Sequence, residues 1–316
     1  MPLDAEFLDW HHVCTIHING QGCVRQLVKR KKSNIRILVL GVFVLTLMTL
    51  LSARADITKD RFHEAREAFV ERKNLISPLS DIDLKTAIEI QDLLMLDVAA
   101  EFGSTSGYFR ERTPAGKPLL GVLLENMFTS TGATVASSNS ANLQLAPAWV
   151  LRIGSTNGTT RAEVLEGDDP ASFFSELIPA VLIRDDLMSE PNPEAITSQT
   201  AVNLGIRFVV MGHPISLSGQ GGLQTVSGTL NATLLNSDGV TLSEGNGLTP
   251  DGAHVALLIR KMASDLKARG RQLRANDLII LGSVGPVTVL NQSPRVVGRF
   301  EAGAETRKIV LAIRPE

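Results

Sequence analysis

The chain has 316 residues, with 31 Lys and Arg against 33 Asp and Glu and a formal net charge of −2 at pH 7. This balance lacks the basic excess with which nucleic-acid-binding proteins hold phosphates, so we expect no nucleic-acid partner. Hydrophobic residues make up 44% and charged residues 20%, which is typical of a globular protein and excludes disorder over the whole chain. The two cysteines are Cys14 and Cys23, so the sequence after them offers no thiolate metal ligand, disulfide or cysteine nucleophile.

Residues 1–55 have the layout of a secretory leader. A cationic cluster at 29–36 precedes an apolar run of 15 residues, Ile37–Leu51, and the letters ARA at 53–55 match a cleavage site. A stable membrane span usually needs about 20 apolar residues, so we favour a cleaved signal and a periplasmic or secreted protein. The alternative is an uncleaved anchor, in which 37–51 tethers the protein to the inner membrane and the positive flank orients the body outward.

The body begins with two patterns of helical period. In 58–73, apolar residues recur every three or four positions, and 81–102 repeats this pattern until Gly103 ends it. An apolar stretch at 114–127 then follows several turn residues. We therefore expect 56–130 to form an N-terminal helical part.

Residues 131–316 are expected to form a β-rich part. Turn residues at 157–158 and 236–239 separate apolar runs, 170–188 reads as a mixture of helix and strand, and 251–269 is an amphipathic helix. The expected strands are 148–153, 207–211, 229–235, 240–243, 278–281, 287–290, 295–300 and 308–313. Together the two parts indicate an α+β fold.

Several short motifs follow one another in a fixed order. In the first half they are 75–79 (LISPL), 87–91 (AIEIQ), 121–127 (GVLLENM), 178–180 (IPA) and 201–212. In the last third they are 234–247, 256–262 and 270–282. Their order and spacing resemble those of the 2-keto-4-pentenoate hydratase family, which is related to the fumarylacetoacetase superfamily. The resemblance implies a fumarylacetoacetase-like β-sandwich or β-roll core behind the N-terminal helical region.

The resemblance also implies a chemistry. Family members act on 2-oxo acids as hydro-lyases, decarboxylases or related enzymes, with Mg²⁺ or Mn²⁺ chelating the substrate and stabilising an enolate. Such hard cations need carboxylate ligands, which the family supplies as a Glu-x-Glu pair on one strand and an acid before an Asn.

The expected acids are missing from this sequence. The Glu-x-Glu positions fall on Ala146 and Ala148, and the acid before Asn203 is replaced by Val202. Phe109 stands where the family has a Lys, and Leu182 where it has a further Glu. Residues 133–153 contain no carboxylate, so a small error in register does not restore the pair.

These replacements favour an exported hydratase-like protein with impaired or absent hydro-lyase activity, which binds a small 2-oxo carboxylate or a protein partner and needs no cofactor. A homo-oligomer is compatible with this interpretation. One alternative is an active hydro-lyase with relocated acids, such as those at 163–169, which would use Mg²⁺ or Mn²⁺. A second is a periplasmic envelope-assembly domain.

A few polar residues are the candidates for a site. The catalytic candidates are Asn203, Ser283 and His213, and the substrate-binding candidates are Arg110, Asn203 and Ser283. Ser283 lies where the family has a small polar residue near the substrate carboxylate. His213 and His254 could act as general bases or be polar boundary residues. The basic cluster at 269–274 could bind a carboxylate or be a solvated helix end.

Overall fold

A computed structural model describes ten stretches of the chain, and the residues from Thr58 to Glu316 form one compact unit. The described residues are 58–75, 78–112, 116, 118–154, 174–187, 195–217, 223, 230–246, 252–289 and 293–314. The leader with its apolar run at 37–51 and the turn at 157–158 lie outside them. Among the helices of the described residues, none is both long and apolar enough to span a membrane.

The larger of two sheets has nine strands in the described part of the chain, in the order β2-β1-β11-β5-β6-β7-β3, with β12 beside β5 and β8 beside β6. It is a mixed sheet, because β1 pairs with β11 and β3 with β7 in parallel while the other pairs are antiparallel. The strands are β1 (Thr105–Arg112), β2 (Pro118–Leu124), β3 (Phe128–Ser130), β5 (Leu143–Ile153), β6 (Phe174–Asp185), β7 (Ile206–Met211), β8 (Ile215–Ser216), β11 (Leu278–Ser283) and β12 (Thr288–Val289).

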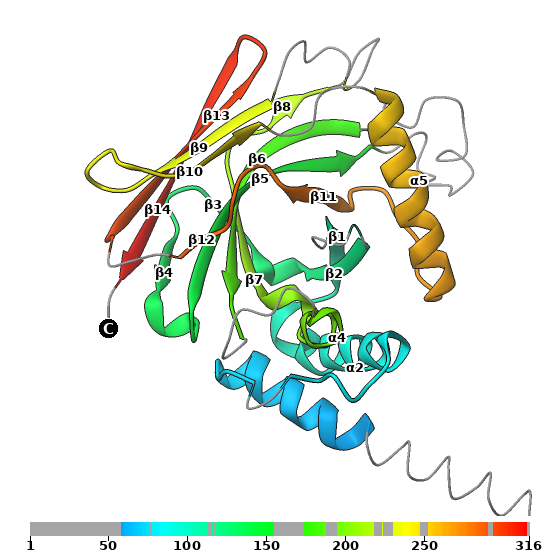
Figure 1. Cartoon of the computed structure of the whole chain (residues 1–316). Helices are drawn as coiled ribbons and strands as arrows, with labels where there is room; N and C mark the ends of the chain where they lie inside the picture. The colour runs from blue at the N-terminus through cyan, green and yellow to red at the C-terminus, as the bar shows by residue number, and fades with distance from the viewer. Residues whose placement is uncertain are drawn as a thin grey trace, which may run out of the picture. The chain divides into compact units, whose positions relative to one another are not determined.

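The smaller sheet has five strands among the described residues, in the order β10-β9-β13-β14-β4. It packs beside the larger sheet, as the strands β9, β13 and β14 in Figure 1 show. Its strands are β4 (Thr134–Ala136), β9 (Leu230–Leu235), β10 (Thr241–Asn246), β13 (Arg295–Ala302) and β14 (Glu305–Arg314). The β9–β10 turn is closed by Asn236, whose side-chain oxygen accepts hydrogen bonds from the backbone of Asp238 and Val240.

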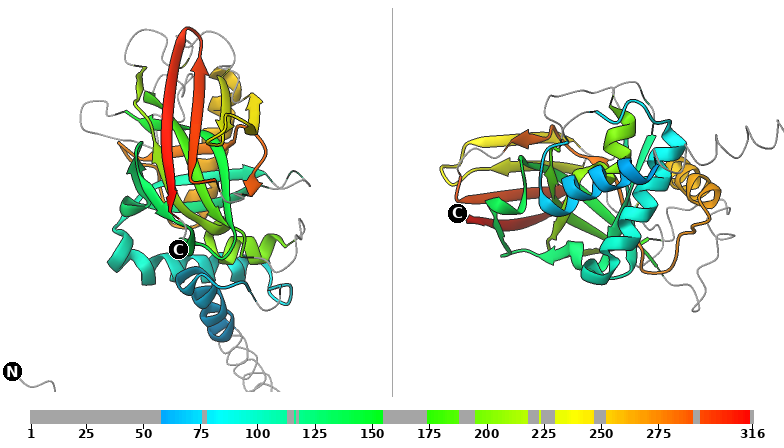
Figure 2. Two further views of the ribbon diagram at one scale, coloured as in Figure 1. Left: turned by 90° about the vertical axis from the view of Figure 1, so that its left-hand side faces the viewer. Right: turned by 90° about the horizontal axis from the view of Figure 1, so that it is seen from below.

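The helices lie in two places. A helix over 58–71, α2 (Leu84–Phe102) and α4 (Ile196–Ala201) gather at one end of the larger sheet, and α5 (Gly252–Ala268) lies apart from them (Figures 1 and 2). Asp83 caps α2 by accepting a hydrogen bond from the backbone of Thr86, and Gly103, at φ 81°, ends it. Short 3-10 turns occur at Glu125–Met127, Ser137–Asn139 and Asn203–Gly205.

Three apolar clusters hold these elements together. The first lies between the two sheets, where the rings of Trp149 and Phe300 meet edge to face at 5.4 Å, and α5 packs against it. The second joins the helices over 58–71 and α2 to β2. The third consists mainly of side chains from six strands of the larger sheet. Side chains from so many strands of one sheet can contact one another only where that sheet curls, so the third cluster fills the interior of a roll.

Two prolines lie in the middle of this sheet, where a missing N–H normally disfavours proline. Pro147 in β5 falls where the neighbouring strand changes from β11, which reaches Ala148, to β12, which begins opposite Leu145. Pro179 in β6 falls between the partners β7 and β8 in the same way. Both prolines therefore sit at breaks in the ladder, where one strand leaves and another takes its place.

The structure confirms most elements expected from the sequence, including the helices at 81–102 and 251–269 and the four C-terminal strands. It differs at 170–188, whose described residues contain one strand, β6, and no helix. This strand is buried on both faces, which removes the alternation that identifies a half-buried strand. The stretch 56–130 also contains β1, β2 and β3 beside its helices.

A buried ion pair connects the helix over 58–71 to the larger sheet. Arg207 in β7 donates to Asp185 in β6 at 2.9 Å, and their side chains are 7% and 0% exposed. The same guanidinium donates to the carbonyl of Phe69 and lies 4.3 Å from the centre of its ring. Asp185 also accepts hydrogen bonds from the backbone of Ala141 and Asn142. Burial lowers the pKa of Arg207, and Asp185 opposes that change.

Replacing Arg207 by Met should lower the free energy of unfolding by about 3–5 kcal/mol, because it leaves the Asp185 carboxylate buried without its cation. Equilibrium unfolding in urea measures this. The matched control is Arg299→Met, which removes an exposed ion pair with Glu301 and should cost less than about 1 kcal/mol. Equal losses in the two variants would contradict a special role for the buried pair.

Candidate functional site

The interior of the roll is the place where the sequence resemblance puts the reaction. Ala146 and Ala148 on β5, Phe109 on β1 and Leu182 on β6 all belong to the third apolar cluster, and each is 0% exposed. The four positions thus come together in space as the resemblance implies. They present only methyl, methylene and aromatic carbon to one another.

This interior does not fit a divalent cation. Mg²⁺ and Mn²⁺ need several oxygen ligands, and side chains of Ala, Phe and Leu offer none. Within the described residues there is no group of three or more His, Cys, Asp or Glu side chains that could hold a metal.

Asn203 lies next to Val202 in the 3-10 turn before β7, and it is fully buried. Its side-chain oxygen accepts hydrogen bonds from the backbone N–H of Val122 at 2.7 Å and from Gln91 at 3.0 Å. Its side-chain nitrogen donates to the carbonyl of Val122 at 2.8 Å. The amide therefore binds both outward-facing backbone groups of Val122 on β2 and attaches this edge strand to the start of β7.

Two of the substrate-binding candidates meet in one cavity of about 410 Å³. β1 and β11 run in parallel, so their C-terminal ends bring Arg110 and Ser283 to the same place. Arg110 is 5% exposed. The Ser283 hydroxyl is buried and has no hydrogen-bond partner among the described residues. Gly282, with φ 103°, lies inside β11 where its pairing with β5 shifts register between Ile280 and Ser283.

An ion pair that was not predicted from the sequence borders this cavity. Glu111, which lines it, accepts a hydrogen bond from Arg184 of β6 at 2.9 Å. The Arg184 guanidinium also lies 5.8 Å from the centre of the Phe109 ring and so covers the edge of the apolar interior. The sequence signalled this pair only through the opposite charges of Glu111 and Arg184, which are 73 positions apart.

The remaining candidates lie elsewhere. His213 follows β7 and His254 is on α5; both side chains are exposed, and neither lines the Arg110–Ser283 cavity. The acids at 163–169, named for an enzyme with relocated ligands, lie outside the described residues.

A second and larger cavity, of about 1000 Å³, lies at the opposite ends of β1 and β11. Its buried carboxylate is Asp277, which accepts a hydrogen bond from the backbone N–H of Arg274 at 2.7 Å. Burial raises the pKa of Asp277 from 3.8 to about 6, although this hydrogen bond and the charge of Arg274 oppose the change. Burial also raises the pKa of Tyr108, and the charge of Asp277 adds to it.

Solved structures share this architecture. 4-Oxalocrotonate decarboxylase from Pseudomonas putida G7, complexed with magnesium and adipate, is 15% identical to this chain with a TM-score of 0.66. The match covers 82% of this chain and 98% of that one. The same enzyme with calcium and acetate matches with a TM-score of 0.63 and 15% identity over 82% and 98% of the two chains. The chain has the fumarylacetoacetase-like fold.

At this level of identity the likeness shows the fumarylacetoacetase-like fold alone. No family model matches the sequence, and neither does any curated protein. The fold prediction from the motif order is thus confirmed at the level of architecture, with two mixed sheets and few helices in the described residues. Both solved structures contain a divalent cation and a small carboxylate, whereas the residues of the rolled interior here do not fit a cation.

Replacing Asn203 by Ala should lower the free energy of unfolding by about 3 kcal/mol, because it leaves both Val122 groups unpaired and puts Ala at φ 53°. Asn203→Gly removes the same bonds but tolerates this φ, so it should recover roughly 1 kcal/mol of the loss. Thermal or urea unfolding measures both. Asn246→Ala, on the exposed side of β10, is the control and should change stability by less than about 0.5 kcal/mol.

Asp277 predicts a pH dependence whose sign follows from its raised pKa. The folded state holds this proton more tightly than the unfolded state, so the stabilisation is complete below pH 3.8 and is lost as the pH rises through about 6. The free energy of unfolding of Asp277→Asn minus that of the unmodified protein should therefore increase as the pH rises from 3.8 to about 6. The upper bound is about 3 kcal/mol for a change of about two pKa units. Unfolding in urea across this pH range tests it, and a constant difference would contradict it.

Proposed function

We propose that this protein is an exported, divergent relative of the 2-keto-4-pentenoate hydratases that binds a small carboxylate and does not carry out their metal-dependent hydro-lyase reaction. The observation that carries the proposal is the cavity at Arg110 and Ser283, which adjoins an interior without metal ligands. Export is inferred from the leader pattern in residues 1–55.

The cavity has the donors that a carboxylate needs. A guanidinium can donate two parallel hydrogen bonds to a carboxylate, and a serine hydroxyl can donate a third. A buried hydroxyl without a partner costs about 1–3 kcal/mol, and a bound oxygen would recover part of this. The Ser283 hydroxyl is buried and has no hydrogen-bond partner among the described residues. This supports a ligand oxygen beside it.

The size of the cavity limits the ligand. A volume of about 410 Å³ is at the lower end of the range for small-molecule sites, so it suits a short carboxylic acid. Glu111 lines the same cavity, and Arg184 neutralises its negative charge through an ion pair at 2.9 Å. The acetate and adipate in the two solved structures have this chemistry.

The two alternatives predict different outcomes. An active hydro-lyase with relocated acids would convert 2-hydroxypenta-2,4-dienoate in the presence of Mg²⁺ or Mn²⁺, and a chelator would abolish the turnover. We expect no turnover under either condition, and chelator-sensitive turnover would overturn the non-catalytic assignment. The envelope-assembly alternative required a different core, so the fumarylacetoacetase-like fold found here does not favour it.

Replacing Ser283 by Ala should separate binding from stability. The variant loses a donor to the ligand, so acetate or adipate should bind roughly fivefold more weakly. The free protein should be equally stable or slightly more stable, because a hydroxyl without a partner among the described residues is removed. Calorimetric titration of the full chain measures the first effect and thermal unfolding the second.

Arg110→Gln should abolish carboxylate binding in the same titration, since the amide cannot supply the charge or the paired donors of the guanidinium. The matched control is Arg295→Gln, on the exposed surface of β13, which should leave binding unchanged. Unchanged affinity in both Ser283→Ala and Arg110→Gln would place the carboxylate elsewhere.

A further inference from the structure

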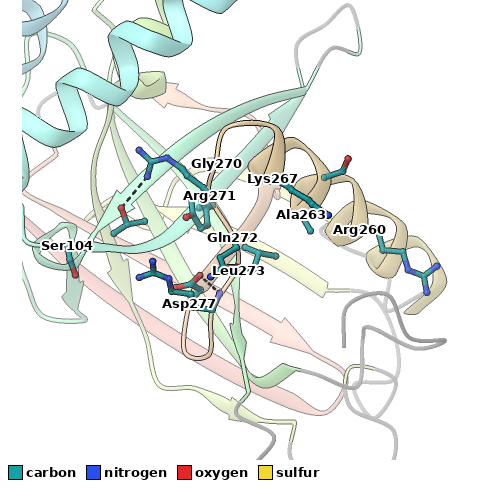
Figure 3. Close-up of a pocket in the computed structure, with 13 residues that line it drawn as sticks. Ser104, Arg260, Ala263, Lys267, Gly270, Arg271, Gln272, Leu273 and Asp277 are labelled. Atoms are coloured by element: carbon teal, nitrogen blue, oxygen red, sulfur yellow. Dashed lines mark hydrogen bonds between the residues drawn. The ribbon is translucent and has the colours of Figure 1, made fainter. Parts of the chain in front are cut away.

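The larger cavity is lined mainly by cationic and hydroxyl side chains. It lies between α5, the loop that follows α5, and the beginning of β1 (Figure 3). Four cations line it and one acid, Asp277. The cations are Arg260, Lys267, Arg271 and Arg274. Hydroxyl groups come from Ser104, Thr105, Tyr108 and Ser264. This set of donors has an excess of positive charge around a concave space.

We propose that this cavity is a binding site for a small molecule with two or more oxyanion groups, such as a polyphosphate or a polycarboxylate. The site is separate from the proposed carboxylate cavity, because the two share no lining residue. They lie at opposite ends of the parallel pair formed by β1 and β11.

Two of the four cations are available for a ligand. Arg271 forms an ion pair with Asp92 at 2.7 Å, so part of its charge is neutralised. It also donates a hydrogen bond to the hydroxyl of Thr105 at 3.4 Å. Lys267 and Arg274 are exposed, and neither forms an ion pair with an acid of the described residues. They come from two different elements, the last turn of α5 and the loop beyond it. Two cations that converge from separate elements suit a ligand with more than one anionic group.

A simpler explanation for some of these charges is the helix end. Cations in the last turn of a helix stabilise the partial negative charge of its carbonyl groups, and Lys267 is in that position. Two of the last carbonyls, those of Leu266 and Lys267, already accept backbone hydrogen bonds from residues 269–271. Arg260 lies two turns earlier on α5, and Arg274 lies beyond the loop. The helix end therefore does not account for the whole set.

The acid in the cavity gives the site a pH response. Ionised Asp277 repels an anion, and its protonated form can instead donate a hydrogen bond. The groups that face it are Tyr108 of β1 and the side chains of Arg271 and Arg274 from the loop. Since burial raises the pKa of Asp277 to about 6, anion binding should tighten as the pH falls through that value.

The test is calorimetric titration of the full chain with inorganic pyrophosphate and, separately, with citrate, at low ionic strength. Binding of either anion that Lys267→Gln or Arg274→Gln weakens supports the site, and the comparison of the two anions distinguishes a phosphate ligand from a carboxylate ligand. Lys267→Gln and Arg274→Gln should each weaken binding about fivefold, and the double variant on the order of twentyfold. Lys261→Gln is the matched control, since Lys261 is an exposed cation of the same helix outside the cavity.

Two further variants complete the test. Asp277→Asn should bind the anion more tightly than the unmodified protein at about pH 8, and this difference between the two proteins should become smaller at about pH 5, where Asp277 is protonated. Arg110→Gln should leave pyrophosphate binding unchanged, which separates this site from the carboxylate cavity. The proposal is overturned if neither anion binds, or if Lys261→Gln weakens binding as much as Lys267→Gln. The latter result would mean attraction to the general charge of α5.

Discussion

The closure of the roll by the Asn203 amide is the contact on which the rest of the structure depends. A sheet that curls leaves an edge strand with unpaired N–H and C=O groups, which are costly if they are buried. Here β2 is that strand, and the side chain of Asn203 takes the place of a neighbouring strand at Val122. Gln91 on α2 donates to the carbonyl of Leu120 and to Asn203, so the helix is fixed by the same network. The apolar interior, α2 and the start of β7 are thereby held in one arrangement.

The rolled interior is a packed apolar core whose side chains offer no ligand to a divalent cation. At Ala146 and Ala148 the side chains are too small to ligate a cation, and Phe109 and Leu182 belong to the same packed cluster. A buried apolar cluster stabilises a fold through area removed from water, whereas a group of buried carboxylates without a metal would destabilise it. The polar residues Arg110, Glu111, Arg184 and Ser283 remain at the end of the strands, where a cavity is open to a ligand.

The sequence predicted the local elements well wherever periodicity was clear. The helix at 251–269 and the hairpin around Asn236 follow from spacing and turn chemistry. The strand β6 was obscured because both of its faces are buried, and β2 was missed because its apolar run resembles a helix segment as closely as a strand. Arg110 and Ser283 were singled out separately, but only the parallel pairing of β1 with β11 brings them together. The roles of Asn203 and Asp277 depend on partners that no local pattern reveals.

The two central strands of the larger sheet are covered on both faces. In β5, Trp149 and Leu151 face the cluster between the sheets, while Ala148 and Val150 face the rolled interior. β6 alternates in the same way, and the two strands pair from Leu143 to Ile153. Water cannot reach their amide groups through a local fluctuation of a loop or helix, so hydrogen exchange there requires the whole unit to open. The slowest-exchanging amides of these strands therefore report the global free energy of unfolding directly, and the apolar interior that protects them contributes to stability without any bound ligand.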